Sequence, residues 1–292
     1  MKLKINIFIN GLRGEEVFNF LMSKKIKINN IFVSKKFNYV PSKKIVSQKP
    51  FFLNTPNDLR KKKFEELLLN RQADMNVVAG FPFIFPNKII LSAKYGTINL
   101  HGGKLPEYRG GSPMNWQIIN NEKKMVISCI KMNEEIDGGN ILCEKKIKIS
   151  EDDDIKTLKI KANKYFPKMV YDSLKKLKDG ELGVVQNAKK SCYWHQRDDE
   201  DGRVDWENMS ARQIFNLIRA TTVPLKGAFT FLNKKKIRIF KVELVKKIIK
   251  GTPGKILIIQ GKGPFVVCND FAIKLIKCSI NIKNFKHKDK FV

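Results

Sequence analysis

Closely spaced cysteines are missing from this sequence of 292 residues, although five cysteines are scattered along it. Structural zinc sites usually place two cysteines two to four residues apart, so we expect no bound metal. The odd number is typical of free thiols in a cytoplasmic protein, where disulfides are rare. The five residues are Cys129, Cys143, Cys192, Cys268 and Cys278.

Long hydrophobic runs are also missing. No stretch approaches eighteen uninterrupted apolar residues, and a membrane-spanning helix needs about that many. The first apolar run is short, and Arg13, Glu15 and Glu16 follow it directly. A secretion signal has a longer apolar stretch and a cleavage site of small residues. We therefore predict a buried first strand and a cytoplasmic protein with no membrane segment.

Arginine is scarce, although the net charge is +29. It supplies 9 of the 57 basic residues, and the lysines form short runs, such as 61–63 and 234–236, spread along the chain. A strongly basic chain suggests that the protein binds nucleic acid or a phosphorylated substrate. However, dispersed lysines without interleaved arginines and aromatic residues favour solvated surfaces over a nucleic-acid groove.

What is present is a globular composition, 42 % hydrophobic and 29 % charged. Short β-rich runs alternate with helical patterns in the first half, which predicts an α/β domain with a Rossmann-like, mostly parallel sheet. We expect strands at 4–10, 30–34, 75–80, 88–91, 97–100 and 125–132. We expect helices at 15–25, 59–70, 114–120 and 155–180, the last ended by a glycine.

The pattern of predicted elements changes after about residue 185. A helix at 210–219 precedes short strands separated by Gly, Pro and Asn-Asp signals. The expected strands are 228–232, 236–245, 254–260, 264–268 and 272–277. Short strands at this spacing indicate a small barrel. We therefore predict a catalytic domain over residues 1–188 and an OB-like β-barrel domain over residues 189–292.

The residues that suggest chemistry follow predicted strands. Asn99 and His101 lie two apart at the end of a strand, so their side chains share one face. Ligands of parallel sheets bind beyond the carboxyl ends of the strands, and Gly102 and Gly103 let the backbone approach a ligand closely. Asp137 stands before two glycines on another such loop. Each signal alone is weak, because a histidine after a strand or an Asp-Gly-Gly turn is often structural.

In combination, these motifs resemble a known family. Residues 98–142 read INLHGGKLPEYRGGSPMNWQIINNEKKMVISCIKMNEEIDGGNIL and are similar to the core of the folate-dependent formyltransferases. That superfamily includes methionyl-tRNA formyltransferase, glycinamide ribonucleotide formyltransferase and the N-formyltransferases of nucleotide-linked amino sugars. Residues 11–14 resemble its first strand-to-helix turn, 78–81 its strand beside the pterin, and 201–206 the start of its carboxyl-terminal barrel.

The resemblance implies that Asn99, His101 and Asp137 are catalytic and that N10-formyltetrahydrofolate is the co-substrate. Formyl transfer to an amine passes through a tetrahedral oxyanion, which the Asn99 amide would stabilise by about 2.7–4 kcal/mol. His101 would accept the proton of the amine, which contributes roughly 10²–10⁴-fold. Asp137 would orient the imidazole and favour its charged form, or relay a proton through water.

The resemblance also implies two sets of binding residues. Folate would contact Phe81, Pro82, Phe83, Ile84, Met132, Asn133, Ile136 and Asp137. The acceptor substrate would contact Gly11, Arg13, Gly102, Gly103, Lys104, Tyr108 and Arg109. Arginine suits bidentate contact with phosphate, but Arg109 would equally serve to pin its own loop to the protein, and the sequence leaves both roles open.

Details of the loops favour an amino sugar as the acceptor. The sequences HGGKLP, RGGSPMNW and CYWHQRDDEDG, at 101–106, 109–116 and 192–202, resemble those of the sugar enzymes. We expect GDP-perosamine or dTDP-4-amino-4,6-dideoxyglucose as the acceptor, in the biosynthesis of O-antigen lipopolysaccharide, and a homodimer by resemblance. The alternative is methionyl-tRNA formyltransferase acting on initiator tRNA, since the second domain also occurs there and the chain is basic.

Overall fold

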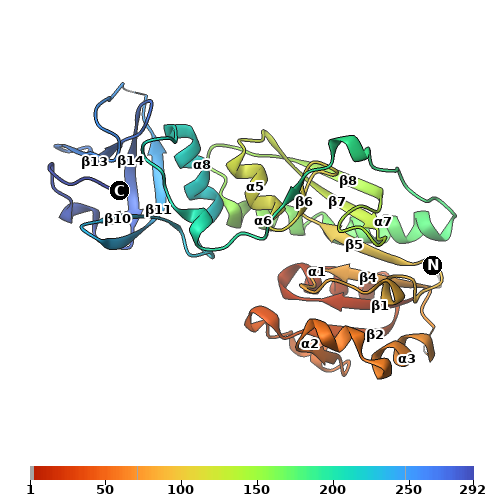
Figure 1. Cartoon of the computed structure of the whole chain (residues 1–292). Helices are drawn as coiled ribbons and strands as arrows, with labels where there is room; N and C mark the ends of the chain where they lie inside the picture. Colours follow the sequence, from red (N-terminus) through yellow and green to blue (C-terminus); the bar gives the residue numbers. More distant parts are fainter. Residues whose placement is uncertain (1–2, 71, 247) are drawn as a thin grey trace. The chain divides into compact units, whose positions relative to one another are not determined.

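The computed structural model describes residues 3–70, 72–246 and 248–292, and the chain separates into two compact units (Figure 1). The first unit takes the residues up to Pro113, Val126–Ile147 and Ile160–Trp194. The second takes Met114–Met125, Lys148–Lys159 and His195–Val292. Each unit has its own large sheet.

The described part of the first unit holds a seven-stranded sheet in the order β3-β2-β1-β4-β5-β7-β8. Its strands are β1 (Lys4–Ile9), β2 (Lys27–Ser34), β3 (Phe51–Leu53), β4 (Met75–Ala79), β5 (Thr97–His101), β7 (Lys124–Lys131) and β8 (Asn140–Lys148). The pairs from β3 to β5 are parallel, whereas β7 is antiparallel to β5. The mostly parallel, Rossmann-like sheet predicted from the sequence is confirmed.

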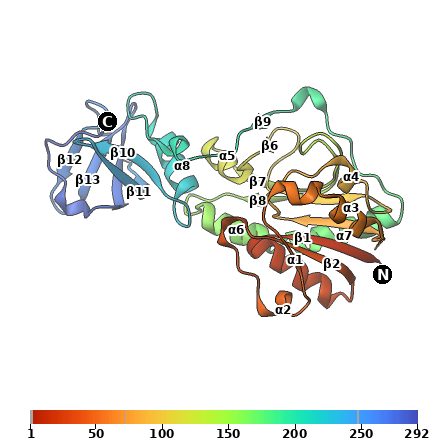
Figure 2. The same cartoon turned by 60° about the horizontal axis from the view of Figure 1, so that its bottom comes forward.

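Helices cover both faces of this sheet (Figure 2). They are α1 (Gly11–Ser23), α2 (Lys43–Val46), α3 (Lys62–Asn70), α4 (Asn87–Ile90) and α7 (Phe166–Lys178). On one face, Phe8 of β1 stacks on Phe32 of β2 at 4.6 Å and packs with Phe64 of α3 and Ile89 of α4. On the other face, α1 contacts β1 and β4, and α7 contacts β5 and α1. Because both faces are covered, β4 is buried throughout, as expected of a central parallel strand.

Three features of residues 1–188 differ from the expectation. Residues 88–91 are not a strand, because α4 occupies that position; a short apolar run does not distinguish the two structures. The single helix expected over 155–180 is two helices, α6 (Ile155–Asn163) and α7, and Pro167 stands in the first turn of α7, where proline is tolerated but cannot continue a preceding helix. Strands β3 and β8 were not predicted.

The second unit has a five-stranded antiparallel sheet among its described residues, in the order β10-β11-β14-β13-β12. The strands are β10 (Ala228–Leu232), β11 (Lys235–Leu244), β12 (Ile256–Ile259), β13 (Gly263–Val267) and β14 (Ala272–Cys278). Helix α8 (Ala211–Thr221) begins with a capping box, in which the Ser210 side chain accepts a hydrogen bond from the Gln213 N–H. Its residues Ile214 and Leu217 are buried in the core of this unit.

Three short elements also bear on the site. Helix α5 (Pro113–Ile119) follows the glycine-rich loop, and β6 (Arg109–Gly110) pairs in parallel with β9 (Tyr193–Trp194). No helix among the described residues is long and apolar enough to cross a membrane.

Candidate active site

The candidate site lies at the end of β5, within the first unit. Asn99 pairs with Val78 of β4 on one side and with Ile130 of β7 on the other. Its side chain is half-buried, whereas His101, two residues later, is 5 % exposed. Strand β5 is the last parallel strand before β7 reverses direction, so both side chains are placed at the rim where such sheets bind ligands.

His101 is held through both of its ring nitrogens. Nε2 lies 2.6 Å from the Tyr108 carbonyl oxygen, and Nδ1 lies 3.3 Å from Asp137 Oδ2. Because a carbonyl oxygen only accepts, Nε2 carries a hydrogen and donates it. Nδ1 is therefore the ring nitrogen that gains or loses a proton, and it faces a carboxylate that is itself 12 % exposed. This contact brings together two residues that the sequence places 36 positions apart.

Gly103 makes the histidine contact possible. A Cβ atom at this position would lie 2.5 Å from His101 Nε2 and 2.6 Å from the Tyr108 carbonyl oxygen. Real Cβ atoms do not approach so closely, so any larger residue would push apart the two groups that orient the ring. The second glycine of the His-Gly-Gly motif thus acts on the histidine itself.

The loop that carries Asp137 is held in an uncommon conformation. Asp137 has φ of +52°, a left-handed value that few non-glycine residues adopt. Its carboxylate Oδ2 also accepts a hydrogen bond from the Gly110 N–H at 2.9 Å. Two residues later, Gly139 passes so near the Lys131 carbonyl of β7 that a Cβ atom would overlap it. The Asp-Gly-Gly motif therefore places the carboxylate through tight backbone packing.

A cavity of ≈ 130 Å³ opens beside these groups. Asn99 and Asp137 line it together with mostly apolar walls from the segments 83–90 and 130–136. The lining residues are Phe83, Ile84, Phe85, Ile90, Asn99, Ile130, Met132, Asn133, Glu134, Glu135, Ile136 and Asp137. A mostly apolar cavity with a few polar groups in its walls is typical of a binding site for a small organic ligand.

Most residues predicted to bind folate lie at this cavity. Phe83, Ile84, Met132, Asn133, Ile136 and Asp137 are all among its lining residues. Phe81 and Pro82 are not. Phe81 is instead packed edge-to-face against Phe8 at 5.6 Å, where it supports the wall from behind.

The residues predicted to bind the acceptor do not line the cavity. Gly11 begins α1 with φ of +65°, and Gly102 and Gly103 are buried in the loop after β5. Lys104 forms an exposed ion pair with Glu107 at 2.8 Å. Acceptor binding by these residues stays a prediction.

Arg13 lies on α1 near the same strand end. Its guanidinium donates a hydrogen bond to the Leu100 carbonyl and lies 4.3 Å from the centre of the Phe166 ring. Burial lowers the pKa of Arg13 to about 10, which still leaves the side chain charged at neutral pH.

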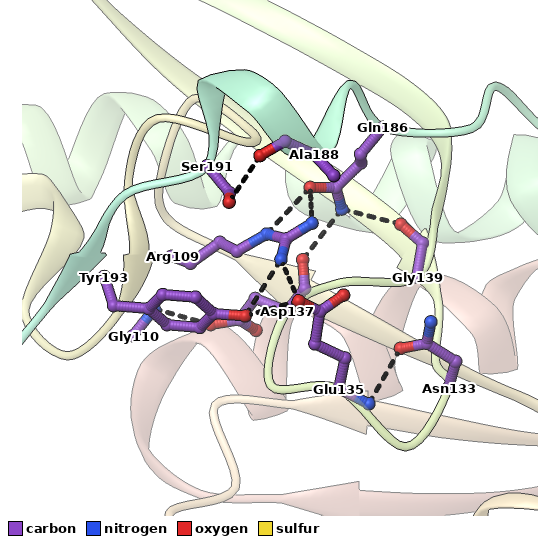
Figure 3. Close-up of polar contacts among 10 residues, drawn as sticks. All are labelled: Arg109, Gly110, Asn133, Glu135, Asp137, Gly139, Gln186, Ala188, Ser191 and Tyr193. Carbon is purple, nitrogen blue, oxygen red and sulfur yellow. Dashed lines mark hydrogen bonds and ion pairs between the residues drawn. The ribbon is translucent and has the colours of Figure 1, made fainter.

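Tyr108 and Arg109 point into the protein. Tyr108 stacks on Trp194 with ring centres 5.6 Å apart. Arg109 is 1 % exposed, and its guanidinium donates to Gln186 and Glu135 (Figure 3). These contacts favour the second role considered for Arg109, which is to pin the loop.

Three residues of this network were not predicted as site residues. Gln186, Glu135 and Tyr193 surround the Arg109 guanidinium (Figure 3). The hydroxyl of Tyr193 and the charge of Arg109 hold the pKa of Glu135 below its usual value. Glu135 lies beside the Asp-Gly-Gly motif and Tyr193 lies in the 192–202 sequence, but neither sequence marks its residue as a partner of Arg109, and Gln186 stands in no motif.

No cluster of three or more His, Cys, Asp or Glu side chains suited to a metal ion occurs among the residues that the structure describes. The Asn99, His101 and Asp137 constellation contains one amide, one imidazole and one carboxylate. Such a set provides a hydrogen-bond donor for a developing oxyanion and an acceptor for a proton.

Comparison with known families covers most of the chain. Residues 4–174 match the family described as formyl transferase, and residues 197–290 match the one described as formyl transferase, C-terminal domain. Methionyl-tRNA formyltransferase of Caldanaerobacter subterraneus subsp. tengcongensis is 35 % identical over 74 % of this chain and 69 % of that protein. The bifunctional polymyxin resistance protein ArnA of Wigglesworthia glossinidia brevipalpis is 38 % identical over 69 % of this chain, but this covers only 31 % of ArnA.

Solved structures share the fold at lower identity. WlaRD, described as a sugar 3N-formyl transferase and solved with dTDP and 5-N-formyl-THF, superimposes with a TM-score of 0.71. It is 17 % identical, and the match covers 94 % of this chain and 97 % of WlaRD. HypX from Aquifex aeolicus gives a TM-score of 0.67 at 16 % identity over 94 % of this chain, which spans 45 % of HypX.

Proposed function

The chain belongs to the formyl transferase family, and from this premise we propose that it moves the formyl group of N10-formyltetrahydrofolate onto the amine of a nucleotide-linked amino-deoxysugar. The observation that supports this most directly is the meeting of Asn99, His101 and Asp137. His101 Nδ1 contacts the Asp137 carboxylate, and Asn99 and Asp137 line one cavity.

The cavity suits a folate. Its apolar side chains, such as Phe83, Met132 and Ile136, offer flat contact to a pterin ring, and the backbone of residues 133–137 offers partners for the amide-like edge of the ring. When bound there, the folate supplies the formyl carbon that the amine attacks. Ile84, which is 71 % exposed at the wall, would be covered by such a ligand.

Asn99, His101 and Asp137 each have a separate role in the proposed reaction. The Asn99 amide donates a hydrogen bond to the oxyanion that forms at the formyl oxygen, an interaction worth about 2.7–4 kcal/mol. The attacking nitrogen must lose a proton, and His101 accepts it at Nδ1 because Nε2 is committed to the Tyr108 carbonyl. The Asp137 carboxylate beside Nδ1 stabilises the imidazolium that results. Collapse of the tetrahedral intermediate then breaks the bond between the formyl carbon and the folate nitrogen, which takes the proton back from the imidazolium and leaves as tetrahydrofolate.

We infer the acceptor from the sequences of the loops. The HGGKLP and RGGSPMNW sequences support an amino sugar, and the fold shared with WlaRD is consistent with that choice. A GDP- or dTDP-linked 4-amino-4,6-dideoxyhexose is our first candidate, for O-antigen synthesis in the cytoplasm by a homodimer. A second candidate is initiator methionyl-tRNA, because a methionyl-tRNA formyltransferase is 35 % identical to this chain.

A panel assay separates these acceptors. The purified protein and formyl-folate are mixed with GDP- and dTDP-linked 3- and 4-amino sugars and, separately, with charged initiator tRNA, and the products are read by mass. We expect formylation of one nucleotide sugar. Formylation of the tRNA alone would assign the second candidate, and formylation of neither would refute the proposed acceptors.

Salt gives an independent test. Each phosphate contact releases counterions, so affinity for a tRNA falls steeply, with a slope of about −0.7 to −0.9 per contact on a log–log plot. A sugar diphosphate makes few such contacts, and we expect a shallow dependence of KM on salt. A steep dependence would contradict the sugar assignment.

A further inference from the structure

The side-chain amide of Gln186 uses its full hydrogen-bonding capacity while being 8 % exposed. Its oxygen accepts from Arg109 Nε at 3.0 Å and from Arg109 Nη2 at 2.8 Å. Its nitrogen donates to the carbonyls of Asp137 and Gly139, each at 2.7 Å (Figure 3). Guanidinium groups only donate and carbonyls only accept, so this is the one orientation of the amide that satisfies all four bonds.

These two donated bonds span the turn that carries the catalytic carboxylate. Asp137 itself is in the left-handed region, a conformation that persists only where the surroundings hold it. The Gln186 nitrogen bridges the carbonyls on either side of Gly138, and Gln186 itself is mostly buried. Hydrogen bonds from a mostly buried side chain face little competition from water, so these two bonds fix the turn at the peptide groups next to the carboxylate.

The same loop is held from a second direction by β6. Arg109 Nη1 donates to Glu135 Oε1 at 2.6 Å, and the neighbouring Gly110 N–H donates to Asp137 Oδ2 at 2.9 Å. Because the buried Arg109 is bonded to Gln186 as well, the strand and the loop share one hydrogen-bonded network. Gln186 is the member of that network that contacts the backbone of Asp137 directly.

We propose that Gln186 is a positioning residue that sets the Asp137 carboxylate beside His101 Nδ1. The inference rests on the catalytic role proposed for Asp137. Loss of the two donated bonds would let the turn relax, and a carboxylate displaced by about 1 Å costs on the order of 10²-fold in rate. Gln186 does not line the cavity, so the binding of folate should be little affected.

Two substitutions test whether Gln186 acts by positioning the Asp137 turn or only by bonding to Arg109. Gln186→Met keeps the length of the side chain and removes all four bonds. Gln186→Glu keeps an oxygen for Arg109 but has no donor for the two carbonyls. We expect both variants to lower kcat about 10²-fold with a folate KM within about twofold of wild type. Full activity of Gln186→Glu would overturn the proposal, because it would show that only the Arg109 contact matters.

Asn140→Asp is the matched control. Asn140 directly follows Gly139, but its Nδ2 donates to the Leu182 carbonyl at 3.1 Å, so its side chain joins nearby parts of the same two segments without bonding to the carbonyls that Gln186 holds. We expect kcat within about twofold of wild type. If Asn140→Asp lost as much activity as Gln186→Met, the effect would be general loosening and the proposal would fail.

A readout without turnover completes the test. The chain has three histidines, so the imidazole proton signals of His101 can be assigned by comparison with His101→Asn. Gln186→Met should shift the His101 signal and leave the signals of His195 and His287 unchanged; an unchanged His101 signal would refute positioning. If Asp137→Asn retained wild-type turnover, the proposed role of Asp137 would fail, whereas this spectroscopic result would still report on Gln186.

Discussion

Two histidines of this chain each face an aspartate, and the shorter contact belongs to the pair that we do not assign to catalysis. His195 Nε2 lies 2.8 Å from Asp201 Oδ1, whereas 3.3 Å separates His101 Nδ1 from Asp137 Oδ2. The side chain of His195 is 63 % exposed, but that of His101 is 6 % exposed. Water screens the exposed pair and competes for its hydrogen bonds.

The surroundings of the two pairs explain their different uses. His195 lies edge-on to Trp116, and Asp201 also accepts the N–H of Asp198, so this pair closes an acidic surface turn. The buried pair instead adjoins an apolar cavity lined by Asn99. A proton acceptor gains from a low-dielectric site with an aligned partner, which only the second arrangement offers. Burial and neighbours, more than distance, distinguish the candidate catalytic pair.

The largest difference between the pairs should appear when each histidine is replaced. We expect His101→Asn to lower turnover at least 10²-fold, because a general base contributes roughly 10²–10⁴-fold. His195→Asn should stay within about twofold of wild type. Steady-state kinetics, with folate binding followed by fluorescence, measures both. Equal losses in the two variants would remove the distinction between the pairs.

Replacing the glycine near each pair should have a smaller effect on kcat. Gly103→Ala forces a Cβ atom against His101 Nε2 and the Tyr108 carbonyl, and we expect about a tenfold loss of kcat, because the imidazole is displaced from its aligned position. Gly202, next to Asp201, would place a Cβ no closer than 3.5 Å to its neighbours. Gly202→Ala should therefore leave kcat unchanged. Normal turnover of Gly103→Ala would argue against a fixed imidazole.

The smallest expected effect concerns pH and the exposed pair. Burial acts to raise the pKa of Asp201, but the Asp198 N–H and the His195 ring outweigh it, and the pKa lies below its usual value. The folded state thus binds this proton less readily than the unfolded chain, whose aspartate titrates near pH ~3.9. The stabilisation is complete above that pH and is lost as the pH falls below it.

Urea unfolding of wild type and Asp201→Asn tests this sign. The wild type should be slightly more stable at about pH 6, and the difference should shrink towards about pH 3.5. A difference that grew on acidification would show that the pKa is shifted in the opposite direction.

Periodicity predicted the main strands well, and it failed where local signals were ambiguous. Strands β1, β4, β5 and β7 follow runs that are apolar enough to be buried on both faces. The isoleucines of α4 form a run too short to distinguish a helix from a strand. Strand β8 was missed because its polar middle, Glu144–Lys146 in a row, hides the alternation of a strand.

The spacing of Asn99 and His101 by itself determined that the two side chains share one face of one strand, because side chains alternate along a strand. The glycines after His101 and Asp137 likewise predicted close backbone packing. Only the tertiary structure decided that the Asp137 carboxylate meets His101 and that Gln186 bonds to its turn. Those contacts join segments 36 to 49 residues apart. Sheet order and buried hydrogen bonds set such distances, and no local pattern encodes them.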